Sequence, residues 1–294
     1  MRQTTWAIGT TVVFIATAAL TPARADDAVD LRGPAPAAGR TTTSATTFKI
    51  KDATVTINVG GMKLNATQSL TATEETEVRV IAVKDRQATK VQTKMIRERV
   101  DIVTTVGGQE MKEQKTGDLE GEVIISERTG DGKWKHALVD TKPTDKQKKQ
   151  LDKRVGPENE DDLYPEGMVK VGHTWTVEAT ALQRVFGNSI TDLKGKLKMK
   201  FVKIEKVDGE DCAVIEAVGK ISGVAKEDEG NLDVELDMQG TTWRSIKTGL
   251  DVKDSAKGTI KMSGTLEMGG AKLDLVLEGP FTIESTKKLK AAKP

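Results

Sequence analysis

The 294 residues suffice for one large domain or two small ones, and 37% hydrophobic with 30% charged residues favours a folded chain over a disordered one. Lys plus Arg number 45 and Asp plus Glu number 44, so the chain has no overall positive field to attract nucleic acid or an acidic membrane. Aromatic residues, at 3%, are too scarce for a base-stacking platform. We therefore expect no nucleic-acid partner.

The first 25 residues have the order of a secretory signal peptide. Arg2 precedes an apolar stretch over residues 6–20 that ends before Pro22, and small residues precede a cleavage position after Ala25. A membrane anchor is the less favoured alternative, because a spanning helix needs about 20 apolar residues and this stretch is shorter. No cysteine near Ala25 offers a site for lipid attachment. The sequence predicts a periplasmic or extracellular protein without a membrane span once the signal is removed.

The remaining chain is dominated by strict alternation of apolar and polar residues, which is typical of strands with one buried face. Clear examples are residues 232–238, residues 196–201, and the series Leu273, Leu275 and Leu277. One dry and one wet face on each strand favour an antiparallel sheet over a parallel one. The predicted fold class is mainly β, with a large antiparallel, curved sheet that forms either a half-barrel or a two-sheet sandwich.

Glycine-containing breaks between these runs predict hairpin turns, and one segment predicts a helix. Thr144 with Gln147 three residues later makes a capping box, so we expect one short helix near 144–155. The breaks are Gly107-Gly108, Gly130-Asp131-Gly132, Asp208-Gly209 and Gly269-Gly270.

The expected organisation is a flexible leader at 26–45, a β-rich domain at 46–286 and a basic tail at 287–294. Two strand blocks, 46–140 and 172–286, flank an insert at 141–171 that contains the helix and an acidic loop. The pattern leaves open whether the blocks form one sheet or two.

The residue types that carry catalysis or bind metal are isolated in this sequence. His136 and His173 each stand alone, and the single cysteine, Cys212, follows two acidic residues that disfavour a thiolate. The acidic run at 158–162 lacks the spacing and glycine of a calcium loop. We expect no catalytic residue, no metal site and no cofactor, and hence a protein that is not an enzyme.

The segment Val169-Lys170-Val171-Gly172-His173-Thr174-Trp175 resembles a Val-x-Val-Gly-x-Thr-Trp segment of uncharacterised secreted bacterial β-rich proteins. Residues 240–250, which end in Thr248-Gly249-Leu250, are similar to a later part of the same family. The resemblance spans at most residues 165–286 and implies a β-rich fold, but it assigns no functional residue. A broader likeness, at the level of fold, is to the half-barrel of periplasmic lipoprotein carriers.

The expected function is noncatalytic binding of an apolar or lipid-like ligand on the concave face of the sheet. The alternative is a structural or protein-interaction module of the cell envelope, in which these apolar residues pack against strands of the first block. The candidate ligand-binding residues are Met199, Phe201, Leu236, Met238, Leu275 and Leu277.

Overall fold

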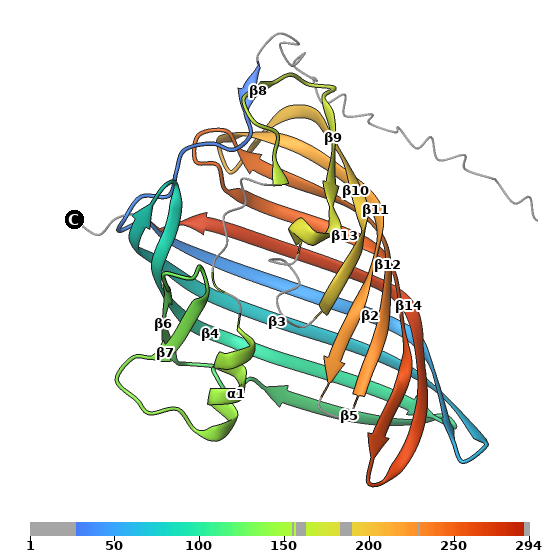
Figure 1. Ribbon diagram of the computed structural model, residues 1–294. Helices are drawn as coiled ribbons and strands as arrows, with labels where there is room; N and C mark the ends of the chain where they lie inside the picture. Colours follow the sequence, from blue (N-terminus) through green and yellow to red (C-terminus); the bar gives the residue numbers. More distant parts are fainter. Residues whose placement is uncertain (1–27, 155, 157–162, 183–189, 228–229, 291–294) are drawn as a thin grey trace, which may run out of the picture.

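The computed structural model describes residues 28–154, 156, 163–182, 190–227 and 230–290, and its main feature is one large curved sheet (Figure 1). The expected signal segment, its cleavage position after Ala25 and the acidic run at 158–162 lie outside the described residues.

Within the described residues, twelve antiparallel strands form this sheet in the order β7-β6-β4-β3-β2-β14-β13-β12-β11-β10-β9, and β5 also pairs with β4. The long strands carry the alternating sequences, so each presents one apolar side. The strands are β2 (Thr41–Val59), β3 (Met62–Lys84), β4 (Gln87–Val106), β5 (Gln109–Thr116), β6 (Val123–Arg128), β7 (Trp134–Leu138), β9 (Thr174–Glu178), β10 (Ile190–Val207), β11 (Glu210–Glu227), β12 (Gly230–Ser245), β13 (Asp251–Met268) and β14 (Ala271–Leu289).

Two-residue turns join most of the long strands, as the glycine-containing breaks predict. Asp208 and Gly209, between β10 and β11, have φ values of 49° and 88°, as a hairpin turn twisted like its strands requires. The pairs Gly107-Gly108 and Gly269-Gly270 have positive φ at both residues as well.

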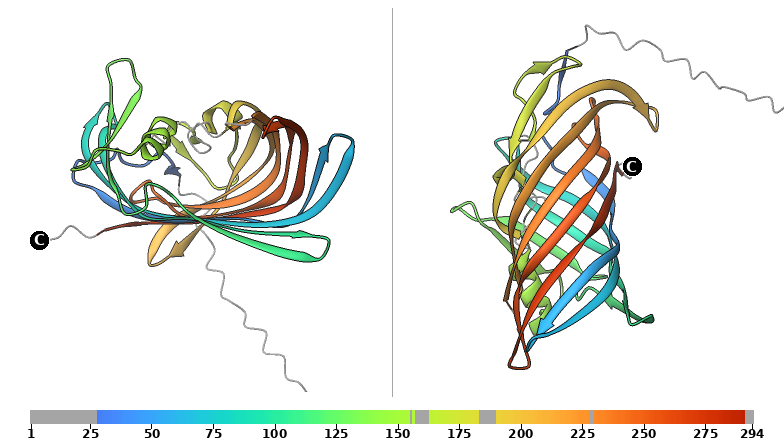
Figure 2. Two further views of the ribbon diagram at one scale, coloured as in Figure 1. Left: turned by 90° about the horizontal axis from the view of Figure 1, so that it is seen from below. Right: turned by 90° about the vertical axis from the view of Figure 1, so that its right-hand side faces the viewer.

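The two strand blocks belong to one sheet, because β2 of the first block pairs with β14 of the second. Their register runs from Thr42 opposite Leu289 to Val59 opposite Leu273. The sheet curves into an open trough that does not close into a barrel (Figure 2). Of the two architectures that the sequence leaves open, the half-barrel is confirmed and the sandwich is wrong.

The helix α1 (Asp145–Lys153) and the 3-10 turn η2 (Ala179–Leu182) lie on the concave side of the sheet (Figure 2). The strand β8 (Met168–Val169) pairs with β1 (Val29–Asp30) in a separate small sheet. The predicted capping box is present: Gln147 N donates to Thr144 Oγ1 at 3.3 Å, and Thr144 N donates to Gln147 Oε1 at 3.0 Å. The predicted helix is therefore confirmed.

Much of the segment expected to be a flexible leader is ordered. Val29 and Leu31 are buried, and β2 begins at Thr41. Threonines favour strands even without apolar neighbours, and their hydroxyls pair across the sheet here: Ser44 Oγ lies 2.7 Å from Thr76 Oγ1. At the other end β14 extends to Leu289, into the expected basic tail. The ordered sheet is thus longer than alternation of apolar residues alone suggests.

Glycines inside the strands allow the tight curvature of the trough. A Cβ at Gly258 would lie 2.0 Å from the carbonyl oxygen of Asp237, and a Cβ at Gly219 would lie 2.1 Å from that of Lys196. Both glycines flank Met238 in one row across the sheet. At these two glycines the backbones of neighbouring strands therefore lie closer together than a Cβ atom on the concave face would allow.

Candidate functional site

The concave face of the sheet is lined by aliphatic side chains in rows that cross many strands. Because directly opposed residues of an antiparallel sheet share a face, the strand register defines each row. One row contains Val106, Ala66, Val55, Leu277, Met262 and Val234, one residue from each of six neighbouring strands. Residues of both strand blocks thus contribute to a single hydrophobic cluster.

All six candidate ligand-binding residues from the sequence belong to this cluster. Phe201 is fully buried, whereas Met238 and Leu275 are only partly buried. Met199, Leu236 and Leu277 are buried as well. The strands of the first block do not cover these residues, since they lie beside them in the same sheet.

One end of the concave face is covered by residues 163–182, which carry the segment that resembles the secreted family. Trp175 lies opposite Met199 in the β9–β10 pair, and its Nε1 donates to the carbonyl oxygen of Leu163 at 2.9 Å. His173, at the turn before β9, is exposed and stacks on Trp175 with ring centroids 5.9 Å apart. Val177, Ala179 and Leu182 are buried in the same cluster. Residues 163–182 therefore cover the apolar side chains at this end of the concave face.

A buried charged network fixes that cover to the sheet. Arg244 Nη1 lies 2.7 Å from Asp251 Oδ1, and the Tyr164 hydroxyl lies 2.9 Å from both carboxylate oxygens of Asp251. The Arg244 guanidinium also stacks 3.8 Å from the centre of the Tyr164 ring and donates to the carbonyl oxygens of Leu31 and Arg32. One arginine thus joins β12, the N-terminal segment and the insert.

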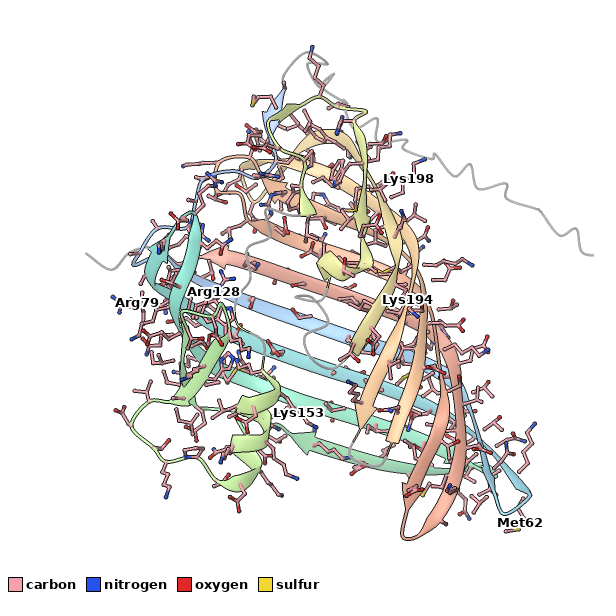
Figure 3. All side chains as sticks on the ribbon, in the orientation of Figure 1. Met62, Arg79, Arg128, Lys153, Lys194 and Lys198 are labelled. Carbon is pink, nitrogen blue, oxygen red and sulfur yellow. The ribbon has the colours of Figure 1, made fainter. Side chains whose placement is uncertain are left out.

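The opposite end, at the hairpin tips, exposes its apolar side chains. Met62 and Leu64 on β3 are 70% and 53% exposed, and Met111 on β5 is 57% exposed. Leu64 lies opposite Ile57, which lies opposite Leu275, so the exposed residues continue a row of the buried cluster. Met62 marks the tip of the β2–β3 hairpin, which projects beyond the trough (Figure 3).

A polar band crosses the concave face on the side nearer α1. Thr242 Oγ1 donates to Asp254 Oδ1 at 2.7 Å, and the hydroxyls of Thr46 and Ser285 lie 3.0 Å apart. Burial and the neighbouring carboxylate of Glu74 raise the pKa of Glu98. By register the band contains Thr242, Asp254, Ser285, Thr46, Glu74 and Glu98.

A second, smaller cluster lies beyond this band under α1. Leu151, the buried apolar residue of the helix, packs with Met95, Leu119 and Ile124. The helix is polar elsewhere, but one leucine is enough to cover this small cluster. The concave face is thus divided into an open apolar end, a covered apolar end, a polar band and the small cluster under α1.

Cys212 is buried and His136 is partly buried. The thiol of Cys212 is buried, and burial together with Glu210 raises its pKa, which disfavours a nucleophilic thiolate. His136 Nδ1 lies 2.8 Å from Ser126 Oγ, and burial lowers the pKa of the imidazole. In the described part of the chain no three His, Cys, Asp or Glu residues gather as a metal site would require.

No helix among the described residues is both long and apolar enough to span a bilayer. The Arg244–Asp251–Tyr164 network could not be read from the sequence, because Tyr164 lies 87 residues before Asp251 in the chain and no motif joins the three residues. The only available signal was that Tyr164 is the single tyrosine of a chain poor in aromatic residues.

No family model and no curated protein matches the chain. A solved structure on lipid–protein interactions in lipovitellin has 10% identity and a TM-score of 0.33; it covers 88% of this chain, which spans only 26% of that one. A DUF1329 family protein from Desulfovibrio piger has 12% identity and a TM-score of 0.14, covering 87% and 88% of the two chains. An outer membrane channel from Pseudomonas putida has 7% identity and a TM-score of 0.25, covering 87% and 97%. At these TM-scores the similarities identify neither a family nor a function.

Proposed function

We propose that this is an exported, noncatalytic protein that binds an apolar or lipid-like ligand on the concave face of its sheet. The proposal rests on one observation: by strand register, a row that holds Leu275 and Ile57 of the hydrophobic cluster runs on to the exposed Leu64 near a hairpin tip. Isolated exposed apolar residues are common on soluble proteins, but a contiguous exposed patch marks a binding surface.

The arrangement of the concave face suits an elongated ligand with one polar end. Aliphatic rows from β2, β3 and β14 offer nonpolar contact along several strands, and apolar contact of this kind gives affinity without directional bonds. The polar band supplies hydroxyl and carboxyl groups farther along the same face. A lipid-like molecule has both parts, whereas a small polar substrate would leave the aliphatic rows unused.

Native mass spectrometry of the protein purified from its own host provides the first test. We expect a bound mass that an organic solvent extracts and that behaves as a lipid. Protein that is entirely free of such a mass, in gentle conditions that preserve noncovalent complexes, would favour the alternative of a protein-interaction module.

A matched pair of variants tests where the ligand binds. Met62→Asp/Leu64→Asp places charge on the exposed patch, and we expect binding of the neutral dye Nile red to weaken about tenfold. Both residues are already exposed, so the fold should persist. Val218→Asp is the control, because Val218 is 52% exposed but lies on the outer face. Equal Nile red affinity in both variants would contradict a binding site on the concave face.

A further inference from the structure

The outer face of the sheet carries a groove of about 850 Å³ over β10 to β13. Two outward-facing rows form it. The first contains Lys198, Val218, Gln239 and Lys257, which lie opposite one another on four consecutive strands. The second contains Thr174, Lys200, Glu216, Thr241 and Ser255. We call this feature the basic groove.

The lysines of the basic groove outnumber its acidic side chains. Within the described residues, Lys198, Lys200 and Lys257 make no ion pair, and Glu216 is the one acidic side chain of the lining. Three ammonium groups and one carboxylate leave the groove with a local excess of two positive charges. The chain as a whole is nearly neutral, so this excess is a local feature.

A neighbouring groove on the same face shows that unpaired lysines are not general here. This balanced groove, of about 530 Å³, contains Lys194, Lys220 and Lys261 together with three acids, Glu235, Asp237 and Glu278. Lys220 Nζ lies 2.9 Å from Asp237 Oδ2. The same face of the sheet, with the same number of lysines, is therefore neutral in the neighbouring groove.

We propose that the basic groove binds a phosphate-bearing ligand. A phosphate group carries about −1.5 to −2 charges near pH 7 and accepts several hydrogen bonds, which matches the excess charge of the groove. Lys198 and Lys200 lie about 7 Å apart along β10, close enough to hold one phosphate between them. The hydroxyls of Thr241 and Ser255 add neutral donors.

Lys257 extends the site across the sheet. Three strand spacings separate it from Lys198, a distance of about 14 Å, so a second anionic group on the same ligand would reach it. A ligand with two or more phosphates therefore fits better than inorganic phosphate alone. The basic groove is on the opposite face from the proposed apolar site and is independent of it.

Two probes distinguish a soluble phosphate ligand from a lipid headgroup. Inorganic tripolyphosphate is titrated into the full protein by calorimetry at low salt, and sedimentation measures binding to phosphatidylglycerol–phosphatidylcholine vesicles. The triple variant Lys198→Gln/Lys200→Gln/Lys257→Gln should weaken binding of the effective probe about tenfold or more. Glu216→Gln, which removes the opposing charge, should strengthen it.

The control is Lys194→Gln/Lys220→Gln/Lys261→Gln, which removes the same number of charges from the balanced groove. Tripolyphosphate binding lost only in the first triple variant supports a soluble ligand, and vesicle binding lost only there supports a headgroup. Equal losses in both triple variants, or no binding of either probe by the unmodified protein, would overturn the proposal. Nile red binding should be unchanged in both triple variants, so failure of the apolar site is recognised separately.

Discussion

Arg244 and Asp251 form a charged pair that solvent barely reaches, with side chains 3% and 12% exposed. A buried charge is tolerated only when partners satisfy it, and here Tyr164 and two backbone carbonyls complete the set. The pair matters less for net stability than for geometry, because it positions the cover at one end of the concave face.

Removing one member of this pair leaves an uncompensated charge. Asp251→Ala should therefore lower the free energy of unfolding by about 3–5 kcal/mol, measured by urea denaturation. Asp237→Ala is the control, since its pair with Lys220 is exposed to solvent and should contribute little to stability. A similar small loss in both variants would show that the network does not hold the cover in place.

Glu98 offers a test that depends on pH. Because folding raises the pKa of Glu98, mainly through burial, the folded state favours the protonated carboxyl. That contribution is fully present below the ordinary pKa of 4.5 and is lost as the pH rises through the raised value. Glu98→Gln, which stays neutral, should increase the free energy of unfolding near pH 7 and give no increase near pH 4.

Unfolding curves in urea at both pH values measure this difference. Glu113→Gln on β5 is the control, because Glu113 is exposed. A gain for Glu98→Gln that is equal at both pH values would exclude ionisation of Glu98 as its cause.

At the level of the strand, glycine sets how tightly the sheet bends. Gly258→Ala would place a Cβ against the backbone of β12, and separating these strands should cost about 1–3 kcal/mol in the free energy of unfolding. Gly130→Ala is the control: no atom lies within 4 Å of its Cβ position, so stability should change by less than about 0.5 kcal/mol. Thermal denaturation of the two variants compares them directly, and equal melting temperatures would contradict a role of Gly258 in curvature.

The strands, their turns and α1 could be predicted from sequence because their signals are local. Alternation within residues 232–238 shows which side is buried, and Thr144 with Gln147 marks the helix start. Interior glycines such as Gly219 are a further local signal, since glycine inside a strand marks a bend or a close approach of the backbone.

The arrangement of the whole molecule needed the structure, because the decisive contacts join distant parts of the chain. The β2–β14 pair includes threonine-rich residues 42–47, which show no apolar alternation and no hint of a partner. Likewise, alternating lysines in residues 194–200 were visible, but their acidic neighbours come from other strands. Only the strand register shows how many acidic residues share a groove with each set of lysines, and so which groove is balanced and which is basic.

The β2–β14 pair lies at the centre of the sheet, with the first strand block on one side and the second on the other. During synthesis β2 leaves the ribosome early and must wait for β14, so the nascent chain retains an unpaired edge until nearly all of the sheet has been translated. Such a long-range contact makes folding slow.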